Sequence, residues 1–326
     1  MRKMISSLLI IIAILALVGC GKSNETSQPE EEVDFPTKDI KVIVPKDPGG
    51  GTDIVARGLV EYTKDKFDKN IIVENQPGGG GVTGMVQGAE ATPDGYTLTM
   101  TTVELAILPH MELSPVTYEN FTGIVSAIAD PASVIVPSDA PYDTLEEFIN
   151  YAKENKGLKV GNSGIGSIWH LAAVAVEDEF KLDFNHIPYD GGSAPAVAAL
   201  AGGHLDAIMV APGNAKSQID AGDLKVLAVM SEERLDSFPD VPTFKEETEM
   251  DFTVQAWAAL TAPSDVPEET LNILSEAFSE TLNDEEFQDF LIKQGIEPVQ
   301  YGPAETQKMM EEDHKRYGEL MKEIDL

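Results

Sequence analysis

The chain contains little cysteine and few basic residues. Cys20 is its only cysteine, so no intrachain disulfide can form. Lysine and arginine number 23 against 56 aspartates and glutamates, and the formal net charge is −33. A nucleic-acid partner would require basic patches, so this balance argues against DNA or RNA binding. An acidic, solvated surface that keeps the protein soluble at high salt or high pH accounts for the charge without any partner.

Patterns for metal, nucleotide-triphosphate or nucleophilic chemistry are also missing. The full Gly-x-x-x-x-Gly-Lys-Ser/Thr pattern of a phosphate-binding loop is absent, and Ile165 stands where a nucleophile elbow at Ser163 would need glycine. Ser167 and His170 lie three residues apart on one helix face, which is more typical of capping than of catalysis. The five histidines show no metal-ligand spacing: His110, His170, His186, His204 and His314. We therefore expect no metal, no cofactor and no enzymatic activity.

One glycine motif resembles a nucleotide site. Gly79-x-Gly81-x-x-Gly84 matches the dinucleotide fingerprint formally and follows an expected strand at residues 71–74. Residues 75–78 intervene, so the tight turn from strand to helix that such a site needs is missing. We interpret the motif as an ordinary glycine turn.

The N-terminus has the pattern of an export signal. Arg2 and Lys3 precede an apolar stretch, residues 8–18, which is short for a membrane span of about 20 residues. The stretch ends in Leu17-Val18-Gly19-Cys20, which resembles the lipobox of bacterial lipoproteins. That resemblance implies cleavage before Cys20 and a diacylglycerol on its sulfur. Residues 21–34 are acidic and polar with almost nothing to bury, so we expect a solvated tether.

From Phe35 onward, short apolar strands alternate with helical stretches, which is typical of an α/β fold. The expected strands are 42–44, 71–74, 97–101, 134–136, 158–161, 186–189, 206–210 and 224–230, and residues 257–262 precede the C-terminal helices. The expected helices are 54–67, 84–91, 144–155 (with a capping box of Thr144 and Glu147), 168–179, 194–201, 268–283, 285–294 and 304–323. No repeat of fixed short period is present, which argues against a solenoid.

Residues 41–57 are the stretch most suggestive of a binding site. A β-branched run ends at Val44, Pro48 and residues 49–51 turn the chain, and Thr52 or Asp53 is placed to cap a helix beginning at Ile54. A strand, a glycine turn and a helix N-terminus leave backbone N–H groups aimed at one spot, where the helix dipole adds positive charge. The stretch therefore predicts half of a site for a small carboxylate.

A second strand–glycine loop–helix unit covers residues 158–170. Gly164 and Gly166 permit close backbone approach and Ser163 and Ser167 add hydroxyl donors, although a helix cap without a ligand explains the same pattern. Residues 190–193 suit a turn plus cap or a ligand contact equally, and Trp257 is more typical of a core than of a ligand wall. If each unit lies in its own lobe, both loops face one cleft at the carboxyl ends of the strands.

With these motifs in view, the chain resembles the solute-binding receptors of tripartite tricarboxylate transporters, also called Bug receptors. The matching stretches run in order from about Phe35 to Tyr317. They are Val44-Pro45…Pro48-Gly49-Gly50-Gly51-Thr52-Asp53, Val73-Glu74-Asn75…Pro77-Gly78, Pro93-Asp94-Gly95-Tyr96, Gly161-Asn162-Ser163-Gly164, Pro188-Tyr189, Gly202-Gly203-His204-Leu205-Asp206, Ala221-Gly222 and Pro239-Asp240-Val241-Pro242-Thr243.

The resemblance implies a two-lobe, periplasmic-binding-protein-like α/β fold (type II, Venus flytrap) with a ligand cleft between the lobes. Its implied division is a signal peptide at 1–19, lipidated cysteine and tether at 20–35, lobe 1 at 36–136 plus 256–326, and lobe 2 at 137–255, with hinges near Val136 and residues 255–257. The implied ligand-binding residues are Gly49, Gly50, Gly51, Thr52, Thr102, Glu104, Ser163, Gly166, Ser167, His170, Pro212 and Asn214.

The resemblance also implies a partner set. Such a receptor is a monomer held by its lipid at the extracytoplasmic face of the cell membrane, and it hands a small mono- or dicarboxylate to membrane permease subunits. Two alternatives stay open: an exported α/β enzyme acting on a carboxylate, and a sensory receptor that docks a membrane kinase.

Three segments depart from the family pattern, and together they add three acidic residues. Lys46-Asp47 replaces the usual aromatic–proline pair, Asp190 follows Tyr189 where many members carry lysine, and Glu104 occupies a segment that often has small polar residues. Added acidic groups near the cleft argue against a tricarboxylate. They favour a solute with one carboxylate or with an amine elsewhere.

Overall fold

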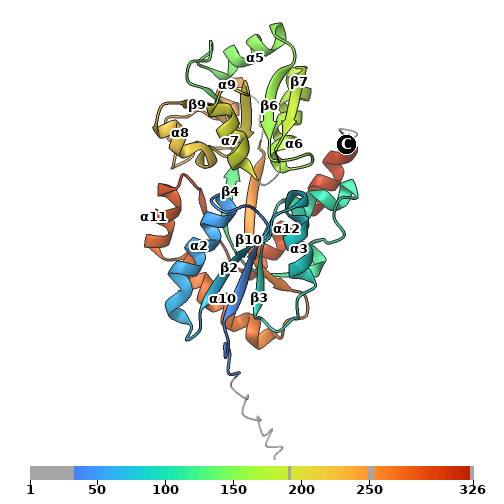
Figure 1. The fold of residues 1–326 in the computed structure, drawn as a ribbon, viewed down its shortest axis with the longest axis vertical. Helices are drawn as coiled ribbons and strands as arrows, with labels where there is room; N and C mark the ends of the chain where they lie inside the picture. Colours follow the sequence, from blue (N-terminus) through green and yellow to red (C-terminus); the bar gives the residue numbers. More distant parts are fainter. Residues whose placement is uncertain (1–32, 190–191, 249–252, 324–326) are drawn as a thin grey trace, which may run out of the picture. The chain divides into compact units, whose positions relative to one another are not determined.

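Two β-sheets form the framework of the computed structural model, which describes residues 33–189, 192–248 and 253–323 (Figure 1). The first sheet has the strand order β11-β4-β10-β3-β1-β2. Its strands are β1 (Ile40–Val44), β2 (Ile71–Asn75), β3 (Thr97–Thr102), β4 (Phe121–Pro131), β10 (Gln255–Pro263) and β11 (Pro298–Tyr301). The second sheet, in the order β7-β6-β8-β5-β9, has β5 (Ser133–Pro137), β6 (Leu158–Asn162), β7 (Phe184–Pro188), β8 (Ala207–Val210) and β9 (Leu224–Val229).

Each sheet contains a parallel group of strands beside antiparallel ones. In the first sheet β1 pairs in parallel with β2 and β3, while β10 is antiparallel to β3 and β4. In the second sheet β6 pairs in parallel with β7 and β8, while β5 is antiparallel to β8 and β9. Loops that follow parallel strands meet at one edge of a sheet, so the segments after β1 and β3, and those after β6 and β8, are brought together.

Helices cover both faces of the first sheet. The apolar core on one face includes side chains of α2 (Gly51–Thr63), α10 (Glu268–Leu282) and α11 (Glu285–Lys293). A second cluster includes side chains of α3 (Val82–Ala89), α4 (Glu104–Ile107) and α12 (Pro303–Glu323), and continues into the second sheet. Because both faces are covered, the strands are buried on both sides.

The helices of the second sheet are α5 (Leu145–Glu154), α6 (Ile168–Phe180), α7 (Ser193–Ala201), α8 (Lys216–Asp220) and α9 (Phe244–Thr248). Five 3-10 turns complete the described elements: η1 (Lys64–Lys66), η2 (Gly79–Gly81), η3 (Leu108–Met111), η4 (Tyr118–Asn120) and η5 (Pro212–Ala215). Within the described ranges no helix combines the length and apolarity needed to cross a membrane. The same ranges hold no group of three or more His, Cys, Asp or Glu side chains placed to bind a metal ion.

The chain passes from the first sheet to the second at Ala132, between β4 and β5, and returns between β9 and β10. The two passages are hydrogen-bonded to each other: Ala132 N–H donates to Val254 O at 2.7 Å, and Met230 N–H donates to Ala132 O at 2.7 Å. Val136, the expected boundary, instead pairs with Lys225 inside the second sheet. The sheet pairing therefore moves the first crossing to Ala132, while the division into lobes stays a prediction.

Strand β4 is the longest of the described elements that the sequence pattern missed. It runs for 11 residues and is almost wholly buried. Its sequence Phe-Thr-Gly-Ile-Val-Ser-Ala-Ile-Ala-Asp-Pro is rich in small residues and shows no alternation of apolar and polar positions. A strand buried on both faces has no reason to alternate, and small residues have weak strand propensity.

Two helix starts differ from the expected ones. Gly50, not Thr52 or Asp53, is the N-cap of α2, so the helix begins three residues earlier than Ile54. Thr144 does cap α5, accepting from Glu147 N–H at 3.2 Å, but the Glu147 carboxylate accepts from Asp143 N–H, so the expected capping box is only half formed. The Asp53 carboxylate is unavailable as a cap because it holds the loop before the helix, as described below.

The close approach of α3 to the first sheet yields a prediction. A Cβ on Gly84 would lie 2.8 Å from Gln76 O and 2.9 Å from Pro45 Cα, both backbone atoms that cannot turn aside. Helix propensity alone would make Gly84→Ala stabilising by about 1 kcal/mol. We expect instead a loss of roughly 1–3 kcal/mol in the free energy of unfolding, measured by urea denaturation, because overpacking prevails.

The matched control is Gly302→Ala, whose Cβ would meet only the end of the Glu305 side chain, at 3.2 Å. This variant should unfold within about 0.5 kcal/mol of the unsubstituted protein. Equal unfolding midpoints for both variants would contradict the close approach.

Candidate functional site

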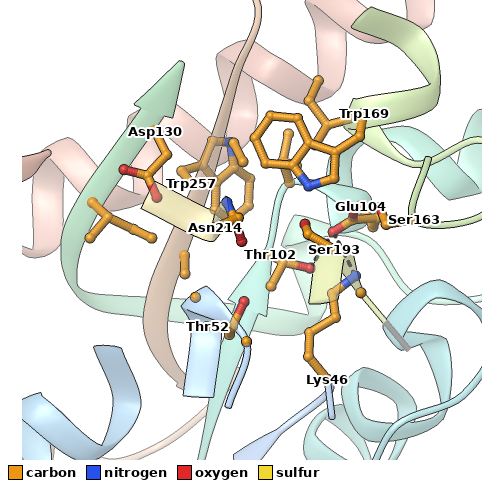
Figure 2. Close-up of a pocket in the computed structure, with 18 residues that line it drawn as sticks. Lys46, Thr52, Thr102, Glu104, Asp130, Ser163, Trp169, Ser193, Asn214 and Trp257 are labelled. Carbon is orange, nitrogen blue, oxygen red and sulfur yellow. Dashed lines mark hydrogen bonds and ion pairs between the residues drawn. The ribbon is translucent and has the colours of Figure 1, made fainter. Parts of the chain in front are cut away.

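A pocket of about 560 Å³, including the part open to solvent, lies where loops of the two sheets meet (Figure 2). The elements of the first sheet contribute Lys46, Gly50, Gly51, Thr52, Thr102, Val103, Glu104, Ile128, Asp130, Ala256, Trp257 and Ala258. The elements of the second sheet contribute Ser163, Ile168, Trp169, Gly192, Ser193 and Asn214. The segments after β1, β3, β6 and β8 all reach the pocket, as expected for strand carboxyl ends.

The N-terminus of α2 forms one side of the pocket. Gly50, its N-cap, has an extended backbone and no side chain to cap the helix. The first N–H groups of a helix have no partner within it, so those of Gly51, Thr52 and Asp53 are free to bind a ligand. A Cβ on Gly51 would lie 3.4 Å from Asn214 Oδ1, which shows how closely this turn faces the second sheet's loop.

Asp53 fixes the shape of the turn before α2. Its carboxylate accepts from Gly49 N–H at 2.9 Å, from Asn75 Nδ2 at 2.8 Å and from Arg57 Nε at 2.9 Å. Burial raises the pKa of Asp53, but the hydrogen bonds from Arg57, Gly49 and Asn75 outweigh it and hold the pKa below its ordinary value. The ionised carboxylate thus organises the loop with its own partners while the N–H groups of the first turn stay directed at the pocket.

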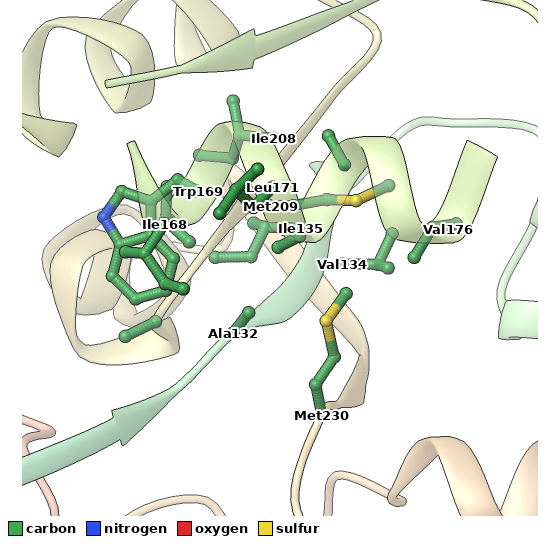
Figure 3. Close-up of a cluster of buried hydrophobic side chains, with 14 of the residues drawn as sticks. Ala132, Val134, Ile135, Ile168, Trp169, Leu171, Val176, Ile208, Met209 and Met230 are labelled. Atoms are coloured by element: carbon green, nitrogen blue, oxygen red, sulfur yellow. The ribbon is translucent and has the colours of Figure 1, made fainter. Parts of the chain in front are cut away.

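The N-terminus of α6 forms the second side. Ile168, Leu171 and Val176 anchor the helix in the core of the second sheet (Figure 3), against Ile135, Ile208 and Met209. Ser167 caps the helix by accepting from His170 N–H at 3.2 Å, and His170 Nδ1 accepts from Gly166 N–H at 3.2 Å. Ser167 Oγ and His170 Nδ1 therefore act in holding the helix end.

His170 carries no charge at neutral pH. Its ring is 7% exposed and contacts His186 edge to face, and burial, with a smaller effect of His186, lowers its pKa to about 4. His186 is in turn hydrogen-bonded to Glu177 at 2.8 Å. His170 thus supports the loop without adding a cation to the pocket.

A third helix, α7, also begins at the pocket. Gly192 is its N-cap and supplies no side-chain cap, and Ser193 at its first position lines the pocket. The helices α2, α6 and α7 have 13, 13 and 9 residues, long enough for their dipoles to matter. The expected turn at residues 190–193 lies partly outside the described residues, since Asp190 and Gly191 are not described.

The lysine that lines the pocket is already paired. Lys46 Nζ lies 3.3 Å from Glu104 Oε2 and donates to Gly80 O at 2.8 Å, and Thr102 donates to Glu104 Oε2 at 2.6 Å (Figure 2). The side chains of Lys46 and Glu104 are 12% and 4% exposed. Their charges cancel locally, so they shape one end of the pocket without offering a free cation to an anion.

Asp130, on β4, lies on the other side of Asn214 and Trp257 from this pair (Figure 2). It is 5% exposed, and its Oδ1 accepts from Glu297 N–H at 3.0 Å. Burial, with Glu297 adding to it, raises the pKa of Asp130 to about 7. Trp257 forms part of the wall and is also core, since its Nε1 donates to Asp313 Oδ2 at 2.7 Å.

The structure brings together many of the residues expected to bind a ligand. Those that line the pocket are Gly50, Gly51, Thr52, Thr102, Glu104, Ser163 and Asn214. Gly49 lines a neighbouring pocket, and the others line neither of the two: Gly166, Ser167, His170 and Pro212. Their contact with a ligand stays a prediction.

Several residues that line the pocket could not be recognised from the sequence, for identifiable reasons. Asp130 and Ile128 lie on the unrecognised strand β4, and Lys46 was noted only as a departure from a pattern. Trp169 follows an expected serine cap and offered no signal of its own.

Substitutions of Lys46 and Glu104 test whether the two charges stabilise each other in the folded protein. Lys46→Met leaves a buried carboxylate without its cation, so we expect the free energy of unfolding to fall by roughly 3–5 kcal/mol. The double variant Lys46→Met/Glu104→Leu removes both charges and should recover more than half of this loss. Urea denaturation of both variants measures the difference, and a double variant as unstable as Lys46→Met would contradict the expected recovery.

Comparisons with known proteins agree with this geometry. Residues 55–326 match the family described as tripartite tricarboxylate transporter family receptor. A UPF0065 protein of Bordetella pertussis is 31% identical over 323 residues, covering 98% of both chains. The solved structure of the periplasmic binding protein BugD is similar with a TM-score of 0.83 and 29% identity, covering 89% of this chain and 99% of that one.

The structure of MatC from Rhodopseudomonas palustris, solved with bound malate, is similar with a TM-score of 0.80 and 28% identity, covering 87% of this chain and 99% of MatC. These matches confirm the expected α/β, two-lobe binding-protein fold and the resemblance drawn from the motifs. Since the family match extends over most of the sequence, the chain belongs to the family of tripartite tricarboxylate transporter receptors.

Proposed function

We propose that this receptor captures a small carboxylate in the pocket between its two sheets, holding it with backbone N–H groups, and delivers it to membrane permease subunits. The observation that carries the proposal is the meeting of three helix N-termini, those of α2, α6 and α7, at one pocket. Helix N-termini favour anions through their free N–H groups and their dipoles. The malate bound to MatC, a relative at 28% identity, supports a carboxylate as the solute.

The strongly acidic surface is compatible with an anionic solute. At physiological salt, exposed charges are screened beyond about 8 Å, whereas N–H groups inside a pocket act at hydrogen-bond distance and in lower dielectric. The net charge of −33 therefore slows the approach of an anion more than it weakens the bound state.

Binding without turnover fits the side chains of the pocket. Ser167 and His170 form a helix cap, and the Glu104 carboxylate is bound by Lys46 and Thr102. These groups are occupied with each other and do not form a nucleophile and base directed at a common atom. We therefore favour a receptor over an exported enzyme. Membrane permease subunits are favoured over a sensory kinase as partner because the family is one of transporter receptors.

The working motion we propose is closure of two lobes, expected at residues 36–136 plus 256–326 and 137–255, about the passages between the sheets. The paired backbone at Ala132, Met230 and Val254 is the short connection that such a rotation would bend.

We also propose that the protein is a monomer held at the extracytoplasmic face of the cell membrane by lipid on Cys20, which lies outside the described residues. The Leu-Val-Gly-Cys sequence after a short apolar stretch supports this. An acyl chain contributes about 0.8 kcal/mol per buried CH₂, and stable anchoring takes more than one chain.

Changing the N-cap of α2 tests the proposed mode of binding. Gly50→Asp places a carboxylate where it can accept from the N–H groups of the first turn, so it should stabilise the helix while competing with the solute. We expect carboxylate affinity, measured by calorimetry on the purified protein, to fall roughly tenfold or more, without a fall in melting temperature.

Gly50→Ala is the matched control, because its Cβ would have Asp47 O as nearest neighbour, at 3.7 Å, and adds no acceptor. It should bind nearly as well as the unsubstituted protein. If Gly50→Asp binds carboxylates with undiminished affinity, the N-terminus of α2 is not the anion site.

The lipid anchor has its own test. Growth of the producing bacterium with a labelled palmitate analogue should label the protein, and Cys20→Ala should abolish the label because the chain has no other cysteine. Ser23→Ala is the control and should keep the label. A label that persists in Cys20→Ala would place the lipid elsewhere.

A further inference from the structure

Within residues 33–189, 192–248 and 253–323, the buried carboxylates are paired with cations, with one exception. In the part of the chain that the structure describes, the aspartate and glutamate residues that are less than a tenth exposed are Asp53, Glu104, Asp130 and Asp313. Asp53 lies 2.9 Å from Arg57, Glu104 lies 3.3 Å from Lys46, and Asp313 lies 3.0 Å from Arg316. Among the described residues, Asp130 has no such ion pair, and the hydrogen bond found for it comes from the Glu297 N–H.

A buried carboxylate without a cation is costly, because one backbone N–H does not replace the water lost on burial. Asp130 lines the pocket, so whatever enters the pocket lies beside it. The pocket's lysine is held by Glu104 and Gly80 on the far side of Asn214 and Trp257 (Figure 2). No side chain lining the pocket therefore neutralises Asp130.

We propose that Asp130 is a specificity-determining residue that binds a cationic nitrogen of the solute, so that the preferred solute is an amino-carboxylate rather than a dicarboxylate. The inference rests on the proposed function, since it assigns the carboxylate of the same solute to the helix N-termini. It adds a second point of recognition: the ammonium supplies the counter-ion that Asp130 lacks. Glu104 cannot take this role because Lys46 already neutralises it.

The pH dependence of solute affinity follows from the ionisation of Asp130 and from the charged groups around it. Glu297 faces it beside β11, and Lys216, Asp220 and Lys293 line the neighbouring pocket that Asp130 also borders. Burial raises the pKa of Asp130 to about 7, so the free protein takes up a proton there as the pH falls below neutrality. A cation binds the ionised form of Asp130, so the affinity for a cationic solute should rise with pH. A dicarboxylate binds better when Asp130 is protonated, so its affinity should fall as the pH rises.

The ionisation of Asp130 should also affect the stability of the unligated protein, which should fall as the pH rises. The folded pKa of Asp130 lies above the ordinary value of 3.8, so the unligated protein loses stability as the pH rises from about 4 to 7. Asp130→Asn keeps an acceptor for the Glu297 N–H and carries no charge. Its melting temperature relative to the unsubstituted protein should therefore increase with pH over this range, which also shows that the variant folds.

The experiment is calorimetry of the purified protein with solutes matched in chain length: 5-aminovalerate against glutarate, 4-aminobutyrate against succinate, and glutamate against glutarate. At pH 8 we expect an amino member to bind at least tenfold more tightly than its diacid. Its affinity should fall about tenfold between pH 8 and pH 6, the value for one group that titrates near 7. Asp130→Asn should remove both the preference and the pH dependence.

Asp220→Asn is the matched control, because Asp220 borders the neighbouring pocket and pairs with Lys216 at 3.0 Å. It should keep the preference for the amino member. Diacids that bind as tightly as their amino partners at pH 8, or an affinity unchanged in Asp130→Asn, would overturn the inference. If those diacids are weakened by Gly50→Asp, the proposed function still stands. Failure of every carboxylate to bind, amino acids included, would instead contradict the proposed function.

Discussion

The backbone N–H groups at the start of a helix must find partners, and this requirement governs the arrangement of the pocket. Each of α2, α6 and α7 follows a strand and a short loop, so its first turn lies at a strand's carboxyl end. Gly50 and Gly192 leave two of these helices without a side-chain cap. The backbone N–H groups that lack a partner within these helices are numerous and fixed in direction. A small anion satisfies them without the loss of side-chain freedom that a lysine or arginine site would require.

The side chains around this backbone site mostly cancel one another. Lys46 with Glu104, and Arg57 with Asp53, form pairs that support the loops, and His170 is neutral because it is buried. The protein can therefore carry a net charge of −33 without filling its pocket with free carboxylates. Asp130 is the exception, and it lies beside the passage between the two sheets. Asp130 therefore lies close both to the proposed solute site and to the segment that would bend on the proposed closure.

Patterns within a few residues of the sequence predicted the turns, loops and helix starts that depend on local structure. The turn at residues 48–53 and the loop at residues 163–167 could be recognised because glycine, serine and helix periodicity act over a few residues. Strand β4 could not, since burial on both faces removes the alternation that marks a strand. Asp130 lies on this strand and was therefore not recognised as a candidate site residue. The pairing of Lys46 with Glu104 joins residues far apart in the chain, and the roles of Ser167 and His170 as supports depend on contacts that spacing does not show.

The most direct test of the account is a crystal structure of the protein with a bound carboxylate. We expect carboxylate oxygens at about 2.7–3.2 Å from the N–H groups of Gly51 or Thr52 and from those at the start of α6 or α7, with Lys46 still paired to Glu104. A carboxylate bound by Lys46 after separation from Glu104, with the helix N-termini facing only water, would contradict it.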